Sequence, residues 1–424
     1  MIELTMKKKN MTFSLFDFCK RRADKVEIYG KESLDENGDI ISFIDQAAYV
    51  THYLQLKRSN IGVPYADKAE ELLSMWYEFV IGKEIKDEIQ GGMVAESSVA
   101  MQQYLFPDLF QAPFQAPHTP KFTFIDLFAG IGGFRMAFQN LGGECVFSSE
   151  WDEQARKTYY ANYGDVPFGD ITKESVKNKI PQGFDILCAG FPCQAFSIIG
   201  KQKGFADTRG TMFFEIQKIL QRHRPKAIFM ENVKQLVTHD KGKTFKVILG
   251  ILADLGYYVK WKVLNALDFG VPQKRERVII VGFLDKKKTD LFSFDFEKKP
   301  YSLSDILQRD DEVDESLFVS DRILQKRKDS TKDKNVFYPS IWHENKAGNI
   351  SVLDYACALR TGASYNYLLV NGYRRPSSRE LLRLQGFPED FRIVVSHQEI
   401  RRQTGNSVAV PMMTEVAKRI KALL

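Results

Sequence analysis

The sequence predicts an α/β protein with a mixed, mostly parallel sheet, a helical N-terminal extension and a smaller second domain. Two observations lead to this fold class. From residue 122 to residue 283, compact apolar runs alternate with stretches whose apolar residues recur at helical spacing. Several of these runs end in a polar or glycine-rich loop, and open α/β sheets bind their ligands at that edge. The alternation therefore predicts the sheet and also where its functional site lies.

The first predicted strand, Phe122–Leu127, runs into a glycine-rich turn, Phe128-Ala-Gly-Ile-Gly-Gly133, and then into a helix. Apolar residues at helical spacing mark that helix: Phe134, Ala137, Phe138 and Leu141. Glycines in such a turn let a ligand approach the backbone closely at the helix N-terminus. The turn lacks the full G-x-G-x-x-G pattern, so it indicates a nucleotide-type ligand only together with other features.

Acidic residues follow the next two predicted strands. The second strand, Cys145–Ser149, ends in Glu150-Trp151, where a carboxylate accepts hydrogen bonds from ribose hydroxyls. Asp170-Ile171 come where a third strand is expected to end, and Asp170 is a candidate acceptor for an adenine amino group. Each acid alone is equally typical of a helix N-cap or a turn. Their succession at strand ends favours one adenosine-containing ligand.

Cys193 follows a predicted buried strand, and it is the central residue of the functional prediction. The apolar run Ile186–Ala189 predicts a buried strand, which Gly190 and Pro192 end. Cys193 follows on the loop just beyond, at the edge of the sheet where chemistry is expected. A free cysteine more often fills space in a core. The other motifs of the chain favour a reactive thiol.

Two further motifs stand at strand ends in the same region. Glu231-Asn232-Val233 follows the predicted strand Lys226–Met230, and Gln273-Lys-Arg-Glu-Arg277 precedes the strand Val278–Phe283. In an extended segment Arg275 and Arg277 share one face. Two guanidinium groups on one face suit a phosphate or a negatively charged intermediate.

The strand–helix alternation stops over residues 284–373, which we predict to be a separate small domain whose loops face a ligand. Residues 374–424 are predicted to return to the first domain, 122–283, and complete it. In this last part, Ser377 and Glu380 form a capping-box pattern. Gln403–Ser407 is expected to be a polar turn before a closing helix, Val408–Leu424.

The N-terminal part differs from the rest in charge. Residues 1–120 hold 13 Lys/Arg against 18 Asp/Glu, whereas the remainder holds 47 against 36, and a basic body suggests a polyanionic partner. We interpret residues 1–104 as an acidic helical module of unknown role that packs on the main domain and is not needed for its chemistry. The four prolines of residues 105–121 predict a linker.

The five cysteines form no zinc-type pattern with histidines, which predicts a reduced, cytoplasmic protein without a metal site. Nor does the sequence contain an apolar run long enough to cross a membrane.

Taken together and in order, the motifs resemble those of the bacterial DNA (cytosine-5)-methyltransferases of restriction–modification systems, most closely the HhaI-like type. The resemblance covers residue 122 to the C-terminus. Its segments are DLFAGIGGF (126–134), AGFPCQAFS (189–197), ENV (231–233), QKRER (273–277), RRPSSRELLRLQGFP (374–388) and QTGNS (403–407). The resemblance implies a Rossmann-like S-adenosylmethionine-dependent methyltransferase domain, with residues 284–373 as its target-recognition domain. It also implies double-stranded DNA as substrate, a monomer, and a restriction endonuclease of the same specificity as functional partner.

The resemblance also implies roles for individual residues. Cys193 would attack C6 of a flipped-out cytosine, Glu231 would hold a proton toward N3, and Arg275 and Arg277 would steady the ring and its charge. The implied cofactor-binding residues are Phe128, Gly130, Ile131, Gly132, Glu150, Trp151, Asp170, Ile171, Pro192, Asn406 and Val408. The implied DNA-binding residues are Gln194, Ser197, Ile199, Arg209, Arg360, Thr361 and Gly362.

Two departures from the family pattern matter. Ala358-Leu359-Arg360-Thr361 stands where the family usually has a Thr-Leu pair, and residues 1–120 lie outside the family core. Three alternatives stay open on the sequence. An RNA (tRNA) cytosine-5 methyltransferase would use the same Pro-Cys and ENV residues. A Rossmann oxidoreductase with a catalytic thiol leaves the later motifs unexplained, and a DNA-binding regulator without catalysis leaves Cys193 and Glu231 without a role.

Overall fold

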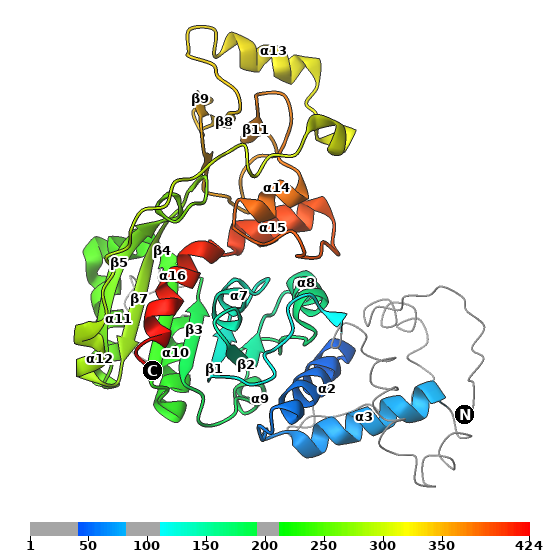
Figure 1. Ribbon diagram of the computed structural model, residues 1–424, viewed down its shortest axis with the longest axis vertical. Coiled ribbons are helices and arrows are strands. Elements are labelled where there is room, and N and C mark those ends of the chain that lie inside the picture. Colours follow the sequence, from blue (N-terminus) through cyan, green and yellow to red (C-terminus); the bar gives the residue numbers. More distant parts are fainter. Residues whose placement is uncertain (1–40, 82–110, 193–211) are drawn as a thin grey trace, which may run out of the picture.

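The computed structural model describes residues 41–81, 111–192 and 212–424. Figure 1 shows a central sheet with helices on both sides and a smaller body beyond one end of it. Two N-terminal helices, α2 (Phe43–Arg58) and α3 (Ala66–Ile81), lie beside the opposite end. The described part of the chain thus has the α/β architecture that the sequence predicts.

The central sheet has six strands in the order β2-β1-β3-β4-β7-β5. The first four pair in parallel, and β7 runs antiparallel to both β4 and β5. The strands are β1 (Phe122–Leu127), β2 (Gly143–Ser149), β3 (Ile186–Gly190), β4 (Ala227–Val233), β5 (Tyr258–Asn265) and β7 (Glu276–Phe283). Because β7 is antiparallel, its first residues lie at the edge where β1 to β4 end. This edge carries the motifs singled out in the sequence.

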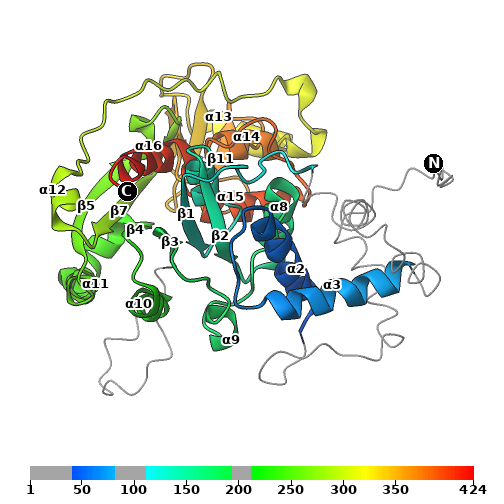
Figure 2. The same cartoon turned by 60° about the horizontal axis from the view of Figure 1, so that its bottom comes forward.

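Helices cover both faces of this sheet, so the domain has three layers (Figure 2). One face packs against α10 (Met212–His223), α11 (Lys243–Asp254) and the N-terminal helices. The other packs against α7 (Gly133–Gln139) and the C-terminal helix α16 (Val410–Lys421). The remaining helices of this domain are α8 (Glu153–Tyr163), the one-turn α9 (Glu174–Lys177) and α12 (Lys286–Leu291). Short 3₁₀ turns follow β4 and β5: η4 (Lys234–Val237), η5 (His239–Gly242) and η6 (Ala266–Asp268).

The smaller body is built on a three-stranded antiparallel sheet in the order β11-β8-β9. It contains β8 (Ile341–Glu344), β9 (Ile350–Leu353), β11 (Leu368–Val370), α13 (Asp321–Asp329), η7 (Asp310–Glu312) and η8 (Glu315–Leu317). Its own core centres on Trp342, Ile350 and Leu369. α14 (Ser378–Arg383) and α15 (His397–Asn406) lie between this body and the central sheet (Figure 1).

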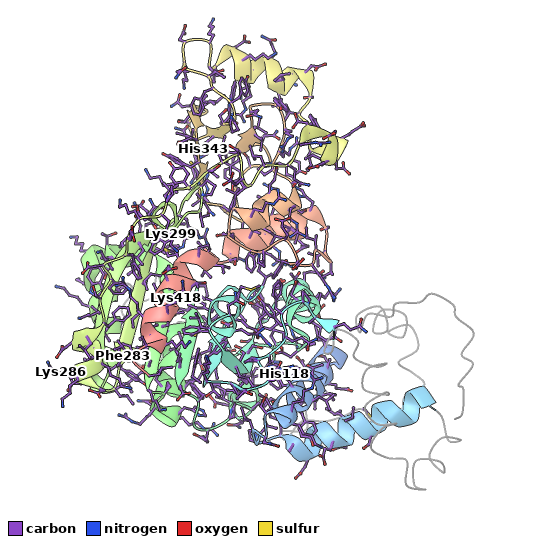
Figure 3. The ribbon with its side chains drawn as sticks, in the orientation of Figure 1. His118, Phe283, Lys286, Lys299, His343 and Lys418 are labelled. Atoms are coloured by element: carbon purple, nitrogen blue, oxygen red, sulfur yellow. The ribbon has the colours of Figure 1, made fainter. Side chains whose placement is uncertain are left out.

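Two kinds of contact connect the smaller body to the larger one. A short parallel pair joins β10 (Ala356–Cys357) to β6 (Gln273–Lys274). Farther along, Lys299 forms an ion pair with Glu415 of α16 at 2.8 Å, which holds the connecting segment against the helix. Figure 3 labels Lys299 together with Lys418 of the same helix. The junction is therefore made by backbone pairing as well as by side chains.

Local sequence signals explain several helix boundaries. The predicted capping box is confirmed, because the Ser377 hydroxyl accepts the Glu380 N–H and the Glu380 carboxylate accepts the Ser377 N–H. Asp152 caps α8 in the same way, accepting the Ala155 N–H at 2.8 Å. Gly164 ends that helix with a φ of +85°, which glycine adopts without strain.

Two local predictions are wrong. The expected third strand near Asp170 is reduced to a single parallel bridge between Ser149 and Phe168. Pro167 lacks an N–H and cannot extend that pairing. Residues 403–406 do not form the expected loop turn before the closing helix. They are the C-terminal end of α15, where the side chains of Gln403 and Thr404 are buried.

Within the described ranges, none of the helices is both long and apolar enough to span a bilayer. The same residues contain no cluster of three or more histidine, cysteine, aspartate or glutamate side chains arranged to hold a metal ion.

Candidate active site

The turn after β1 and the acid after β2 are joined directly. The Gly130 N–H donates to Glu150 Oε2 at 2.8 Å, and the Asp152 N–H donates to Glu150 Oε1 at 2.9 Å. Burial raises the pKa of Glu150, which is 8% exposed, while these two N–H groups oppose that shift. Gly130 has a φ of +56°, and the space where a side chain would begin is open. The turn therefore offers bare backbone next to a fixed carboxylate, as the adenosine part of a cofactor requires.

The next two glycines are required by close packing rather than by a ligand. A Cβ on Gly132 would lie 2.3 Å from the Tyr163 ring, and one on Gly133 would lie 2.5 Å from Cγ2 of Val408. Val408 precedes α16 and is 6% exposed. The first turn of α7 and the segment before α16 thus meet with no room for a methyl group.

We expect Gly133→Ala to push the Val408 segment away from the turn, lowering the melting temperature and weakening S-adenosylmethionine binding severalfold. Overpacking of this kind costs about 1–3 kcal/mol. Val408→Ala removes the clashing methyl groups, so the double variant should regain much of the lost affinity. Calorimetric titration of the four proteins tests this; equal affinity in Gly133→Ala and the unaltered protein would contradict it.

The other predicted cofactor residues differ in what they present to a ligand. The Trp151 side chain is 79% exposed, Asn406 and Pro192 are exposed, and Phe128 is half-buried with a left-handed φ of +57°. Asp170 Oδ1 accepts the Thr172 N–H at 2.9 Å, so Oδ2 has no partner within its own turn. The side chains of Ile131 and Ile171 are 1% and 4% exposed and pack into the core. These two isoleucines therefore have only their backbone near the site.

Glu231, at the end of β4, lies next to the end of β3. Its Oε1 is 2.7 Å from Nε of Arg277, and its Oε2 is near Gly190. The neighbouring Asn232 donates from Nδ2 to the Phe191 carbonyl at 2.8 Å. Phe191 and Pro192 lead into Cys193, so Asn232 fixes the last described part of the backbone before the predicted nucleophile. Sequence reasoning did not assign this function to Asn232, although the ENV motif contains it.

The two arginines of the QKRER motif do not share a function in this geometry. Arg277 pairs with Glu231, whereas Arg275 is 2% exposed and donates to main-chain oxygens. Its Nη1 donates to the Leu359 carbonyl at 3.2 Å, and its Nη2 donates to the carbonyls of Gly405, also at 3.2 Å, and Ser407. Burial is the main cause that lowers the pKa of Arg275, and the nearby positive charge of Arg277 lowers it further.

The expectation that both arginines face the reacting base is therefore corrected for Arg275. That expectation treated the motif as one strand, but β6 ends at Lys274 and β7 begins at Glu276. Arg275 lies in the break between the strands, and its side chain points into the junction between the two bodies.

Gln273 completes this junction, although no role for it was predicted from the sequence. Its Oε1 accepts the Leu359 N–H at 3.0 Å, and its Nε2 donates to the Leu384 carbonyl at 2.5 Å. The side chain is fully buried. The place of a glutamine in a sequence motif does not show whether its side chain is exposed or, as here, buried with both amide groups hydrogen-bonded.

Arg360, Thr361 and Gly362 are exposed, and they lie directly against the cofactor-side motif at the end of α15. A Cβ on Gly405 would be 2.8 Å from the Thr361 nitrogen. The structure therefore brings these predicted DNA-binding residues to the same region as Asn406, although more than 40 residues separate them in the sequence.

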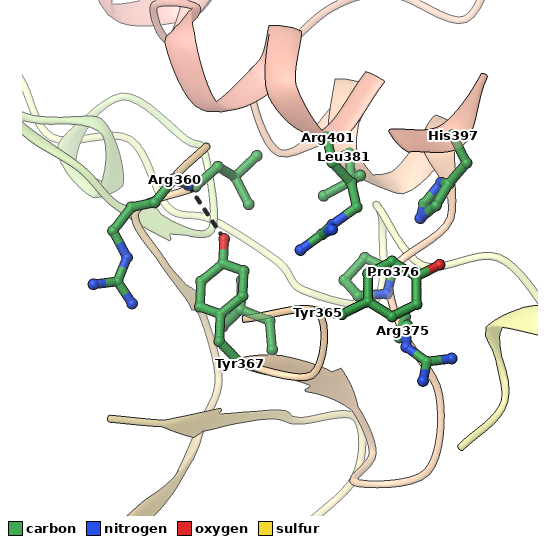
Figure 4. Close-up of a pocket in the computed structure, with 10 residues that line it drawn as sticks. Arg360, Tyr365, Tyr367, Arg375, Pro376, Leu381, His397 and Arg401 are labelled. Carbon is green, nitrogen blue, oxygen red and sulfur yellow. Dashed lines mark hydrogen bonds between the residues drawn. The ribbon is translucent and has the colours of Figure 1, made fainter. Parts of the chain in front are cut away.

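A pocket beside these residues gathers cationic and aromatic side chains, as Figure 4 shows. Tyr365 lies between the guanidinium groups of Arg375 at 4.3 Å and Arg401 at 4.6 Å from its ring. The guanidinium group of Arg360 lies 5.2 Å from the ring of Tyr367, and the backbone N–H of Arg360 donates to the Tyr367 hydroxyl. Arg401 comes from α15 and Arg375 from the chain before α14, and neither was predicted as a partner of Tyr365 from the sequence.

The remaining predicted residues are Cys193, Gln194, Ser197, Ile199 and Arg209, and they lie outside the described residues.

Comparison with known proteins identifies the family of the chain. Residues 122–422 match the model of the family described as C-5 cytosine-specific DNA methylase. The chain is 55% identical over 300 residues to the type II methyltransferase M.HaeII of Haemophilus aegyptius, covering 70% of this chain and 92% of that protein. It is 40% identical over 316 residues to the type II methyltransferase M.HhaI of Haemophilus parahaemolyticus, covering 71% and 94%.

The solved structure of the Dnmt2 methyltransferase of S. pombe matches with a TM-score of 0.54 at 21% identity, covering 72% of this chain and 99% of that one. A likeness at this identity concerns the fold. The family match favours the methyltransferase over the oxidoreductase and the non-catalytic regulator for residues 122–422. The chain belongs to the family of C-5 cytosine-specific DNA methylases and is a DNA cytosine-5 methyltransferase with S-adenosylmethionine as its methyl donor.

Proposed function

We propose that the protein methylates C5 of one cytosine, turned out of the helix, within a short specific sequence of duplex DNA. The observation that carries this proposal is the Glu231–Arg277 ion pair at the edge of the sheet, beside Gly190. The last described residues before Cys193 are joined to the same place through Asn232. An acid paired with a guanidinium group, next to the backbone that leads into a cysteine in the sequence, suits a reaction that must first activate a ring.

The proposed chemistry starts from the poor nucleophilicity of cytosine C5. The Cys193 thiolate adds to C6, and the displaced electron pair makes C5 nucleophilic. Glu231 holds a proton toward N3, which relieves the negative charge that the addition creates. Arg277 keeps Glu231 in place and steadies the ring. S-adenosylmethionine supplies the electrophilic methyl group. Loss of the C5 proton then expels Cys193 and restores the aromatic ring.

We propose that the cofactor lies along the turn after β1. Glu150 is placed to accept hydrogen bonds from the ribose hydroxyls and Asp170 one from the adenine amino group. Phe128 and Trp151 offer ring faces to the adenine and the ribose surroundings, and Gly130 and Gly132 lie in the turn beneath them. Pro192, Asn406 and Val408 complete the remaining side, with Ile131 and Ile171 contributing backbone alone.

We propose that residues 284–373 form the target-recognition domain and that their junction with α15 faces the DNA. Arg360, Thr361 and Gly362 are exposed there, and the Arg375–Tyr365–Arg401 stack adds positive charge beside them. Gln194, Ser197, Ile199 and Arg209 are proposed DNA contacts on sequence grounds. Taking the base out of the stack costs roughly a few kcal/mol, which contacts of this kind offset.

Exchanging residues 284–373 for the same region of a relative with another specificity should transfer the methylated sequence. Direct readout depends on side chains placed in a groove, and these belong to the exchanged region. Sequencing of DNA from expressing cells, after conversion of unmethylated cytosines, reads out the new site. A folded, active chimera that methylates the original sequence would refute the assignment.

The same sequencing applied to the unaltered protein tests the proposed function itself. Duplex DNA and tRNA assayed side by side separate it from methylation of RNA. The 90 residues of the proposed target-recognition domain, 284–373, and the type II relatives do not favour RNA as the substrate. We further propose that the protein acts as a monomer in the cytoplasm, where bacterial DNA lies. There it would protect that DNA from a restriction endonuclease of the same specificity, with no stable complex between the two.

A further inference from the structure

Helix α2 covers a part of the sheet that the catalytic domain leaves open. Between Gly169 and β3, the only helix that the structure describes is the four-residue α9. The edge strand β2 and the segment that follows α8 would therefore lack a covering helix on this face. Phe168, in that segment, instead packs against Tyr49 and His52 of α2 and against Tyr65, with ring centroids 4.8–5.6 Å apart.

Buried polar groups of α2 bind the same segment and the neighbouring strand β2. Thr51 Oγ1 accepts the Val166 N–H at 3.0 Å, and both groups are fully buried. His52 Nε2 lies 3.3 Å from Asp165 Oδ2 and 3.3 Å from the Ser148 hydroxyl of β2. Buried groups with such partners fix a backbone more tightly than apolar contact does, because each one is costly to leave unpaired.

The N-terminal end of α2 reaches the residue before Asp170. Asp45 Oδ1 is 2.7 Å from Nη2 of Arg156, whose Nε donates to the Pro167 carbonyl at 2.9 Å. The same carboxylate oxygen lies 3.3 Å from where a Cβ on Gly169 would be. Asp45 and Arg156 therefore support residues 167–169 from two sides.

The segment that α2 holds is in turn paired with the strand that presents Glu150. The Phe168 N–H donates to the Ser148 carbonyl, and the Glu150 N–H donates to the Phe168 carbonyl, both at 2.8 Å. Phe168 therefore fixes the backbone of Glu150 through these hydrogen bonds, and the same segment continues directly into Asp170.

We propose that α2 is a positioning element of the cofactor site, acting through Thr51, His52 and Asp45 on residues 165–170. The inference rests on the proposed cofactor roles of Glu150 and Asp170. It replaces the expectation that residues 1–104 are unnecessary for the chemistry. Although the family match begins at residue 122, α2 supplies a wall of the site that lies within that match.

Thr51→Val and Asp45→Asn test the proposal in the full-length protein. Thr51→Val leaves the buried Val166 N–H without an acceptor, and Asp45→Asn removes the charge opposite Arg156. The dissociation constant and KM for S-adenosylmethionine should rise roughly 5- to 20-fold, with kcat changed less than about twofold. Thr51→Ser, which keeps the hydroxyl, should restore affinity. Asp67→Asn, in the first turn of α3 and exposed, is the matched control and should have no effect.

A purely structural role predicts a different result. Destabilisation lowers the folded fraction, and so it lowers kcat and the melting temperature while KM stays constant. That pattern in both variants would overturn the proposal. Should Thr51→Val fail to fold, Asp45→Asn decides alone, because Asp45 is at the partly exposed rim of the contact.

Glu150→Gln distinguishes failure of this inference from failure of the proposed cofactor site. When Glu150→Gln weakens cofactor binding in calorimetric titration but the α2 variants do not, the inference is wrong and the site stands. An unchanged dissociation constant in Glu150→Gln would instead refute the site assignment and the inference with it.

Discussion

Replacing Cys193 with serine should abolish the covalent enzyme–DNA adduct and lower methyl transfer by on the order of 10³-fold or more. A serine hydroxyl is a much weaker nucleophile than a thiolate, so C6 is not attacked and C5 is not activated. Fluorine at C5 of the target cytosine cannot be removed as a proton can. A duplex of this kind therefore traps the unaltered protein after one transfer, as a complex of one protein per strand that survives denaturation.

The control for this experiment is Cys188→Ala. Cys188 is fully buried in β3, and burial raises the pKa of its thiol well above the ordinary value. It stays protonated and unreactive, so the alanine variant should still form the adduct. Duplex binding by Cys193→Ser should survive, which separates lost chemistry from lost binding. Adduct formation or near-normal methylation by Cys193→Ser would show that the proposed mechanism is wrong.

Glu231→Gln should slow methyl transfer by roughly 10²- to 10⁴-fold, the range typical of a lost proton donor. Glutamine keeps the size of the side chain but carries no transferable proton toward N3. It also leaves Arg277 without its anionic partner at 2.7 Å. Single-turnover rates with labelled cofactor, at saturating DNA, measure the chemical step apart from binding.

Glu276→Gln is a matched control for this variant. The carboxylate of Glu276 pairs with Lys234. Arg277 donates to the backbone carbonyl of Glu276, which the substitution leaves in place. The amide variant of Glu276 should react at nearly the normal rate. If Glu231→Gln also stays within a few-fold of the unaltered protein, Glu231 does not take part in the proton transfer we assign to it.

Sequence patterns predicted most of the central domain because its signals are local. The buried strands, the glycine turn and the capping box at Ser377 each depend on residues close together in the chain. Motif order then identified the family. The positions of Glu150 and Glu231 at one edge followed from the rule that parallel strands end together, whereas Arg277 reaches that edge because β7 runs antiparallel to β4.

The parts that the sequence did not predict depend on contacts between distant residues. Nothing local marks Thr51 and His52 as partners of residues 165–166, since more than 100 residues separate them. Alternation alone placed Arg275 beside Arg277, because it ignored the break between β6 and β7. The stack of Arg375 and Arg401 on Tyr365 draws on three segments that only the fold brings together.

The contacts of Arg275 have a consequence for how such proteins diverge. Its guanidinium binds carbonyl oxygens of Leu359, Gly405 and Ser407, and every amino acid carries the same carbonyl. The attachment is therefore insensitive to which side chains residues 284–373 carry. Mutations there can accumulate, or the whole region can be replaced by recombination, while its attachment to the larger body is retained. New sequence specificities can then arise without compensating mutations at the junction between the two bodies.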